Sequence, residues 1–154
     1  MEVFQLSFGE KIKTVHFFNK NYSSIPIKFE VEANTFFVVA KEKDGVFYHW
    51  VHFFGSQQEA KNFSCTFEYF HKDTENVVFS QTCQALSIDE TAKSIIKNGK
   101  CFGVSSNTFA TKMVKKGERK YRKFNIFEFN LEIRNLKEEV KDENIESGVS
   151  DIDE

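Results

Sequence analysis

Four histidines and three cysteines are the side chains of this chain best suited to bind metals or to act as nucleophiles. His49 and His52 are the closest pair of histidines. Residues three apart on a strand point to opposite faces, so these two cannot bind one ion without a bulge between them. We therefore expect half-exposed strand histidines here and no metal site.

The cysteines, Cys65, Cys83 and Cys101, are far apart in the sequence. None forms a Cys-x-x-Cys or Cys-x-x-His pair, which zinc modules use to present two ligands to a tetrahedral ion. A nucleophilic cysteine needs a neighbouring base that the sequence does not place. No nucleophile elbow or phosphate loop is present either. We expect reduced, partly buried thiols, no cofactor and no catalytic site.

Positive charge is concentrated in residues 112–123. The basic side chains there are Lys112, Lys115, Lys116, Arg119, Lys120, Arg122 and Lys123. Three interpretations stay open, namely a solvated hairpin whose charge discourages aggregation, a docking site for an acidic partner or for the chain's own acidic tail, and a nucleic-acid surface. Charge alone carries little specificity, so nucleic acid is not the partner we expect.

Two Ser-x-x-Glu capping boxes, beginning at Ser56 and Ser87, mark where helices are expected to start. The first is soon followed by strand-forming sequence, so it predicts a short helix at about 56–62. The second predicts a helix at about 88–97, which Asn98-Gly99 would end.

Runs rich in aromatic and β-branched residues predict strands between these helices. The expected strands are Glu2–Phe8, Lys13–Phe18, Ile25–Val31, Thr35–Ala40, Val46–Phe54, Phe63–His71, Val77–Gln84, Cys101–Ser105 and Lys120–Ile133. Asp44-Gly45 predicts a tight hairpin turn. In the last strand, we expect Phe124, Ile126 and either Phe127 or Phe129 to face the core.

The composition fits one mostly β domain, an antiparallel β-sandwich with two short helices. The chain has 154 residues, of which 19 are Phe, and no apolar run long enough to span a bilayer. We expect the domain to cover residues 1–136. Residues 137–154 carry eight acidic and two basic side chains, which predicts a disordered tail. The N-terminus lacks leader features, which favours a cytoplasmic or nuclear location.

Several segments, in this order, resemble the C-terminal substrate-binding domain of the Seven in absentia (Sina/SIAH) ubiquitin ligases, a TRAF-like β-sandwich. The similar segments are 36–39, Asp44-Gly45, 54–56 with Ala60, Asn62 and Phe63, Ser87-Ile88 with Glu90, 92–98, Cys101-Phe102 and 130–133. The resemblance implies a non-catalytic module that recognises substrates and dimerises. Family members carry a RING finger and zinc fingers ahead of this domain, and their ligands are absent from this chain. We therefore expect no ubiquitin transfer by the chain alone.

The resemblance also implies a groove in which a partner peptide adds as an extended strand to a sheet edge. The matching positions are Val15, Phe17, Asn19 and Asn130. Where the family has a larger aromatic residue this chain has Phe17, and where it has an apolar residue this chain has Asn19, so peptide choice is expected to differ or to be lost. Alternatively, Val15 and Phe17 are ordinary core residues, since apolar alternation alone does not separate core from groove.

The expected function is recognition of extended, degron-like peptides for ubiquitin-dependent degradation, by a homodimer or by a heterodimer with a Sina-type ligase. One alternative is a RING-less regulator that heterodimerises with full-length ligases and recognises no peptide itself. Another is an adaptor that binds acidic ligands through the basic hairpin. No membrane partner is expected.

Overall fold

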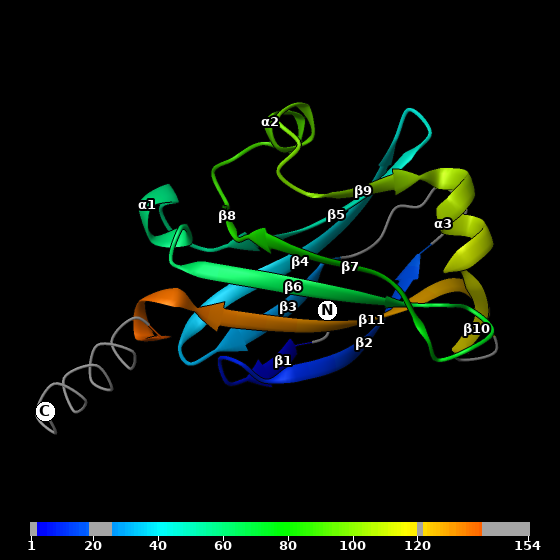
Figure 1. Cartoon of the computed structure of the whole chain (residues 1–154), viewed down its shortest axis with the longest axis horizontal. Coiled ribbons are helices and arrows are strands. Elements are labelled where there is room, and N and C mark those ends of the chain that lie inside the picture. Colours follow the sequence, from blue (N-terminus) through cyan, green and yellow to red (C-terminus); the bar gives the residue numbers. More distant parts are fainter. Residues whose placement is uncertain (1–2, 19–25, 120–121, 140–154) are drawn as a thin grey trace, which may run out of the picture.

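The structure, a computed structural model, describes residues 3–18, 26–119 and 122–139. Most of these residues lie in strands, and the strands form two sheets that pack face to face (Figure 1). The prediction of a mostly β sandwich is therefore confirmed. Aromatic and β-branched residues suit the pleated, half-buried surfaces of such sheets, which explains why this sequence forms them.

In the described ranges, the first sheet has six strands in the order β1-β3-β4-β5-β8, and β9 also pairs with β5. The strands are β1 (Val3–Leu6), β3 (Ile27–Val31), β4 (Asn34–Lys43), β5 (Val46–Phe53), β8 (Leu86–Ser87) and β9 (Phe102–Ser105). The predicted hairpin turn joins β4 to β5. Asp44 and Gly45 have φ values of 51° and 79°, both in the left-handed region that a type I′ turn requires.

The second sheet has five strands within the described ranges. They are β2 (Lys11–Phe18), β6 (Phe63–Phe70), β7 (Val77–Gln84), β10 (Lys115–Arg119) and β11 (Arg122–Asn135). The long strand β11 pairs with β6 and β10 along one edge and with β2 along the other. β6 pairs in turn with β7. As a result, β2 and β7 lie at opposite sides of this sheet.

Phenylalanine rings fill the space between the sheets. The fully buried rings include those of Phe29, Phe36, Phe67, Phe127 and Phe129. Burying each such side chain stabilises the fold by about 1.5–3 kcal/mol. At one end of the sandwich α3 (Ser106–Lys112) closes the core, because its Phe109 stacks on Phe47 with ring centroids 3.7 Å apart (Figure 1).

The short helix α1 (Gln57–Ala60) confirms the first capping box. The Ser56 hydroxyl accepts a hydrogen bond from the Glu59 main-chain N–H at 3.1 Å. This bond satisfies one of the N–H groups that a helix start leaves without an intrahelical partner.

The second capping box is wrong as a helix start. α2 (Ala92–Lys97) is capped by Thr91, whose hydroxyl accepts from the Ser94 N–H at 3.2 Å. Ser87 instead belongs to β8, and its hydroxyl donates to the Gly55 carbonyl at 2.7 Å. α3 has no counterpart among the predicted helices.

The direction of the side chains on β11 also differs from the prediction. Phe127 and Phe129 face the core and are fully buried. Phe124, expected in the core, is only partly buried and belongs to the outer face of the sheet. Ile126 is buried as expected, at 8% exposed, but it pairs with Phe17 of β2 and so belongs to the same outer face. After β11, residues 136–139 form one helical turn, and the rest of the predicted tail lies outside the described residues.

Candidate functional site

Strand β2 forms one edge of the second sheet. It pairs with β11 from Phe18↔Asn125 to Lys11↔Glu132. Among the strands that the structure describes, none pairs with its other edge. An unpaired edge presents main-chain N–H and C=O groups that another strand can bind.

The hydrogen-bond pattern shows which β2 residues present these groups. The Leu136 N–H donates to the Asn62 carbonyl at 2.8 Å, so even-numbered residues of β11 bond to β6. Bonding direction alternates along a strand, so odd-numbered residues of β11 bond to β2. The register pairs odd-numbered residues of β11 with even-numbered residues of β2, so the even-numbered β2 residues bond to β11. The main-chain groups that point away from the sheet therefore belong to the odd-numbered residues Lys11, Lys13, Val15 and Phe17.

The side chains of these four residues lie on the outer face of the sheet. The intervening residues Thr14, His16 and Phe18 are buried between the sheets, whereas Val15 and Phe17 are only half-buried. Val15 and Phe17 are thus not part of the core between the sheets, which was the alternative interpretation of their spacing. One face of β2 presents both side chains, and their main-chain groups point away from β11.

Two of the predicted site residues can be placed relative to this face through β11. Asn130 pairs with Lys13, so its side chain shares the outer face with Val15 and Phe17. The Phe17 ring meets the Phe124 ring edge-on, with centroids 5.9 Å apart. The fourth predicted residue, Asn19, lies outside the described residues.

A chain of polar contacts fixes Asn130. Its amide donates to Glu68 Oε1 at 3.3 Å, and Glu68 forms an ion pair with Lys11 at 2.8 Å. The hydrogen bond from Lys11 lowers the pKa of Glu68, and the bond from Asn130 lowers it further. The Glu68 carboxylate therefore stays ionised and orients the Asn130 amide on the outer face.

Charge around Val15 is balanced by a second group of contacts. Lys13 Nζ lies 3.1 Å from Glu128 Oε2 and 5.1 Å from the centre of the Phe70 ring. Lys115 of β10 pairs with the same carboxylate. Burial alone would raise the pKa of Glu128, but the bonds from Lys115 and Lys13 outweigh it, so the pKa is lowered.

The outer face contains residues that the sequence analysis does not assign to a site. Phe124 extends the apolar surface beyond Phe17, Ile126 is buried on the same face, and Lys11 and Glu68 orient Asn130. In the sequence, the period-two spacing of Phe124 and Ile126 indicates that they share one face. Phe127 and Phe129 have the same spacing on the other face, so the pattern does not show which pair faces the core.

Most of the basic segment lies in β10 and at the start of β11, which pair from Lys115↔Ile126 to Arg119↔Arg122. Lys115 is engaged by Glu128, and Lys116 Nζ donates to Asn125 Oδ1. Successive residues of a strand point to opposite faces, so Lys115 and Lys116 of the predicted basic patch lie on different faces. Of its other members, Lys112 ends α3, Lys123 lies opposite Glu118, and Lys120 lies outside the described residues.

The histidine and cysteine side chains are largely buried. His49 and His52 are 0% and 9% exposed, so the expectation of half-exposed histidines is wrong. Cys65 and Cys101 are buried, Cys83 is partly buried, and all three are free thiols. Burial raises the pKa of Cys101 to about 11 and also raises that of Cys83. In the ranges that the structure covers, no group of three His, Cys, Asp or Glu side chains is placed to hold a metal ion.

Two sheets packed around aromatic rings form a β-sandwich, and the β2 edge with the half-buried face beside it has the geometry that strand addition uses. Residues 28–122 match the family model described as "Sina, TRAF-like domain". This match covers more than half of the chain, so the chain belongs to the Sina family. No curated protein matches it. No helix among the described residues is long and apolar enough to cross a membrane.

Proposed function

We propose that this chain is a non-catalytic module that binds extended, degron-like peptides along the edge of β2 that faces away from β11. The proposal is supported by Val15, which combines outward main-chain groups with a half-buried apolar side chain, and by the half-buried Phe17 side chain on the same face. In strand addition, main-chain bonds supply affinity and side-chain contacts supply specificity. Lys13 and Asn130 border these positions and offer polar contacts.

Membership of the Sina family supports a role in substrate binding and dimerisation. We further infer that the bound peptides come from proteins destined for ubiquitin-dependent degradation. The ubiquitin-transferring activity would come from a full-length Sina-type ligase that pairs with this chain. The residues from 1 to 136 would form this module, and the acidic residues that follow would remain outside the peptide site.

A peptide titration tests the proposal. A library of short labelled peptides is first screened against the wild-type chain, and the binders are titrated against the double variant Phe17→Ala, Asn130→Ala. We expect the double variant to bind at least about tenfold more weakly, since each lost contact costs on the order of 1 kcal/mol. Lys43→Glu, on the other sheet, serves as the control.

Equal affinities of the wild type and the double variant would remove the proposed groove. If no peptide binds but the chain co-purifies with a full-length Sina-type ligase, the chain acts as a heterodimerising regulator instead. Binding of acidic ligands that falls steeply with added salt would instead favour the basic hairpin.

A further inference from the structure

Strand β7 is the other edge of the second sheet, and its main-chain groups can be assigned in the same way. The Ala85 N–H donates to the Phe63 carbonyl at 3.0 Å, which marks a hydrogen-bonded pair of the β6–β7 ladder. Alternation along the ladder then directs the N–H and C=O groups of Ser80, Thr82 and Gln84 away from β6. Within the described ranges, no hydrogen bond to these groups is found.

The sequence of β7 lacks the usual protection of an exposed edge. Natural sheets protect such edges with charged residues, prolines or bulges, because an unprotected edge pairs with other chains. Residues 77–84 contain no charged residue and no proline, and the register shift lies at the start of the strand, near Phe70 and Val77. The β2 edge, by contrast, carries Lys11 and Lys13.

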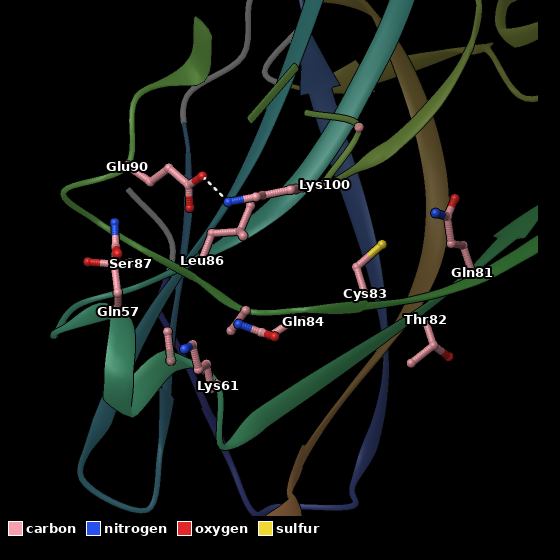
Figure 2. Close-up of a pocket in the computed structure, with 13 residues that line it drawn as sticks. Gln57, Lys61, Gln81, Thr82, Cys83, Gln84, Leu86, Ser87, Glu90 and Lys100 are labelled. Atoms are coloured by element: carbon pink, nitrogen blue, oxygen red, sulfur yellow. Dashed lines mark hydrogen bonds and ion pairs between the residues drawn. The ribbon is translucent and has the colours of Figure 1, made fainter. Parts of the chain in front are cut away.

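A pocket of about 440 Å³ lies along the end of this edge (Figure 2). Cys83 and Thr82, successive residues of β7, project to opposite sides of the strand beside it. The other walls come from α1, from β8, from Glu90 before α2 and from the segment that follows α2. The volume falls within the range of about 300–1,000 Å³ that is typical of ligand sites. A strand added to β7 would place alternate side chains in this pocket.

The charges of the pocket favour an acidic side chain. Three charged residues line it, Lys61, Lys100 and Glu90. Glu90 is already satisfied by Lys100 at 2.7 Å and by the Ser94 hydroxyl at 3.4 Å. For Lys61, no partner is found among the described residues, and the Lys100 ammonium has further donors. The remaining lining groups are uncharged, so the pocket has an excess of positive charge.

We propose that the β7 edge and this pocket form a second binding site, which takes an extended peptide with an acidic side chain from another protein. The main-chain groups of Ser80, Thr82 and Gln84 bind the peptide backbone, and Lys61 with Lys100 bind its carboxylate. This site is separate from the β2 edge and does not depend on the function proposed for that edge.

The test begins with a chain whose β2 edge is disabled by Val15→Pro and Phe17→Ala. Short random peptides displayed on phage are selected on this chain, and the selected peptides are titrated against further variants. Thr82→Pro removes an outward N–H without breaking a bond to β6, and Thr82→Val is its matched control. Lys61→Glu reverses the pocket charge, and Lys43→Glu is the control on the other sheet.

We expect the selected peptides to be rich in Asp and Glu. Thr82→Pro should weaken their binding about tenfold, and Lys61→Glu about fivefold, whereas both controls should bind as before. In the starting chain, the peptide should slow amide hydrogen exchange at Ser80, Thr82 and Gln84. It should also protect the Cys83 thiol from N-ethylmaleimide. Melting curves confirm that each variant is folded.

Three results would overturn the proposal. The first is a selection in which Thr82→Pro weakens the binding of none of the selected peptides. The second is a Lys61→Glu variant that binds the selected peptides with the same affinity as the starting chain. The third is a dimer, seen by analytical ultracentrifugation, that Thr82→Pro converts to monomers, because a second copy of the chain would then occupy the edge.

Discussion

His49 Nδ1 lies 2.7 Å from the Tyr69 hydroxyl at the centre of the sandwich, where both side chains are fully buried. The His16 ring lies on the facing sheet, with its centroid 5.6 Å from that of His49. Burial lowers the pKa of His49, and the neighbouring His16 lowers it further. The fold therefore disfavours protonation of this core histidine.

This arrangement predicts that acid destabilises the protein. The unfolded chain binds a proton at His49 near its ordinary pKa of 6.5, whereas the folded chain does so only at lower pH. Below that pH the unfolded state holds more protons, so the free energy of unfolding falls as pH falls. The slope is at most about 1.4 kcal/mol per pH unit for each such histidine. Urea titrations between about pH 7.5 and about pH 5.5 measure it.

A double variant, His49→Phe with Tyr69→Phe, keeps both rings and removes the titrating group together with its partner. We expect it to lose stability less steeply with acid, although His52, whose pKa burial also lowers, keeps part of the slope. His71→Gln, in the loop after β6, is the control. A double variant as acid-sensitive as the wild type would contradict this account.

Gly55 is required by the packing of Phe53. A Cβ atom at Gly55 would lie 2.3 Å from Cε2 of the Phe53 ring, which is 3% exposed and packed against Phe36 and Phe63. We therefore predict that Gly55→Ala destabilises the protein by about 1–3 kcal/mol, in the range of other overpacked cores. Phe53→Leu should relieve part of this cost, so the double variant should be more stable than the two single effects predict. Additive effects, measured by urea unfolding, would exclude the clash.

The elements that the sequence predicts correctly depend on residues close in the chain. The Asp44-Gly45 turn needs only backbone conformations that these two residues tolerate. The Ser56 cap needs only the Glu59 N–H three residues on. The order of the segments that resemble the Sina family predicts the family, and the match of residues 28–122 confirms it.

The two helix starts that it misses have different causes. The Ser87 hydroxyl is taken by the Gly55 carbonyl, 32 residues away, and so it cannot cap a helix. α3 has a local signal, the cap at Ser105 with Phe109 and Met113 four residues apart, but it lacks the Glu of a capping box.

For the candidate site, the alternation of side chains along a strand predicts that Val15 and Phe17 share a face. It does not show whether that face is the core or the outer surface of the sheet. Both faces of this sheet carry aromatic residues, as Phe17 outside and Phe18 inside show. Only the register with β11 settles which face is outer and which main-chain groups point away from the sheet.

Ser87 itself gives a further prediction. Its buried hydroxyl donates to the Gly55 carbonyl at 2.7 Å and accepts from the Asp89 N–H at 3.2 Å. Ser87→Ala leaves both groups without this partner, so we expect a loss of about 1–3 kcal/mol in the free energy of unfolding. Ser87→Thr should retain part of the stability, because it keeps the hydroxyl. If the Ser87→Ala variant has the same melting temperature as the wild type, the hydrogen bond to Gly55 does not stabilise the fold.

The free edge of β2 predicts opposite results for prolines at neighbouring positions. The Val15 N–H points away from the sheet, so Val15→Pro should keep the β2–β11 ladder, shift the melting temperature little and weaken peptide binding about tenfold. The Thr14 N–H points toward β11, so Thr14→Pro should cost about 3 kcal/mol or more of stability.

Val15→Thr separates the main chain from the side chain in this experiment. Threonine keeps the β-branch and the N–H, so its peptide affinity should stay close to that of the wild type if main-chain bonds dominate. Circular dichroism melting and peptide titration give the two readouts for each variant. If the Val15→Pro variant binds peptide with the affinity of the wild type, the β2 edge is not the peptide-binding site. Thr14→Pro that melts like the wild type would show that the assigned bonding direction is wrong, and the main-chain groups of Val15 would then face β11 instead.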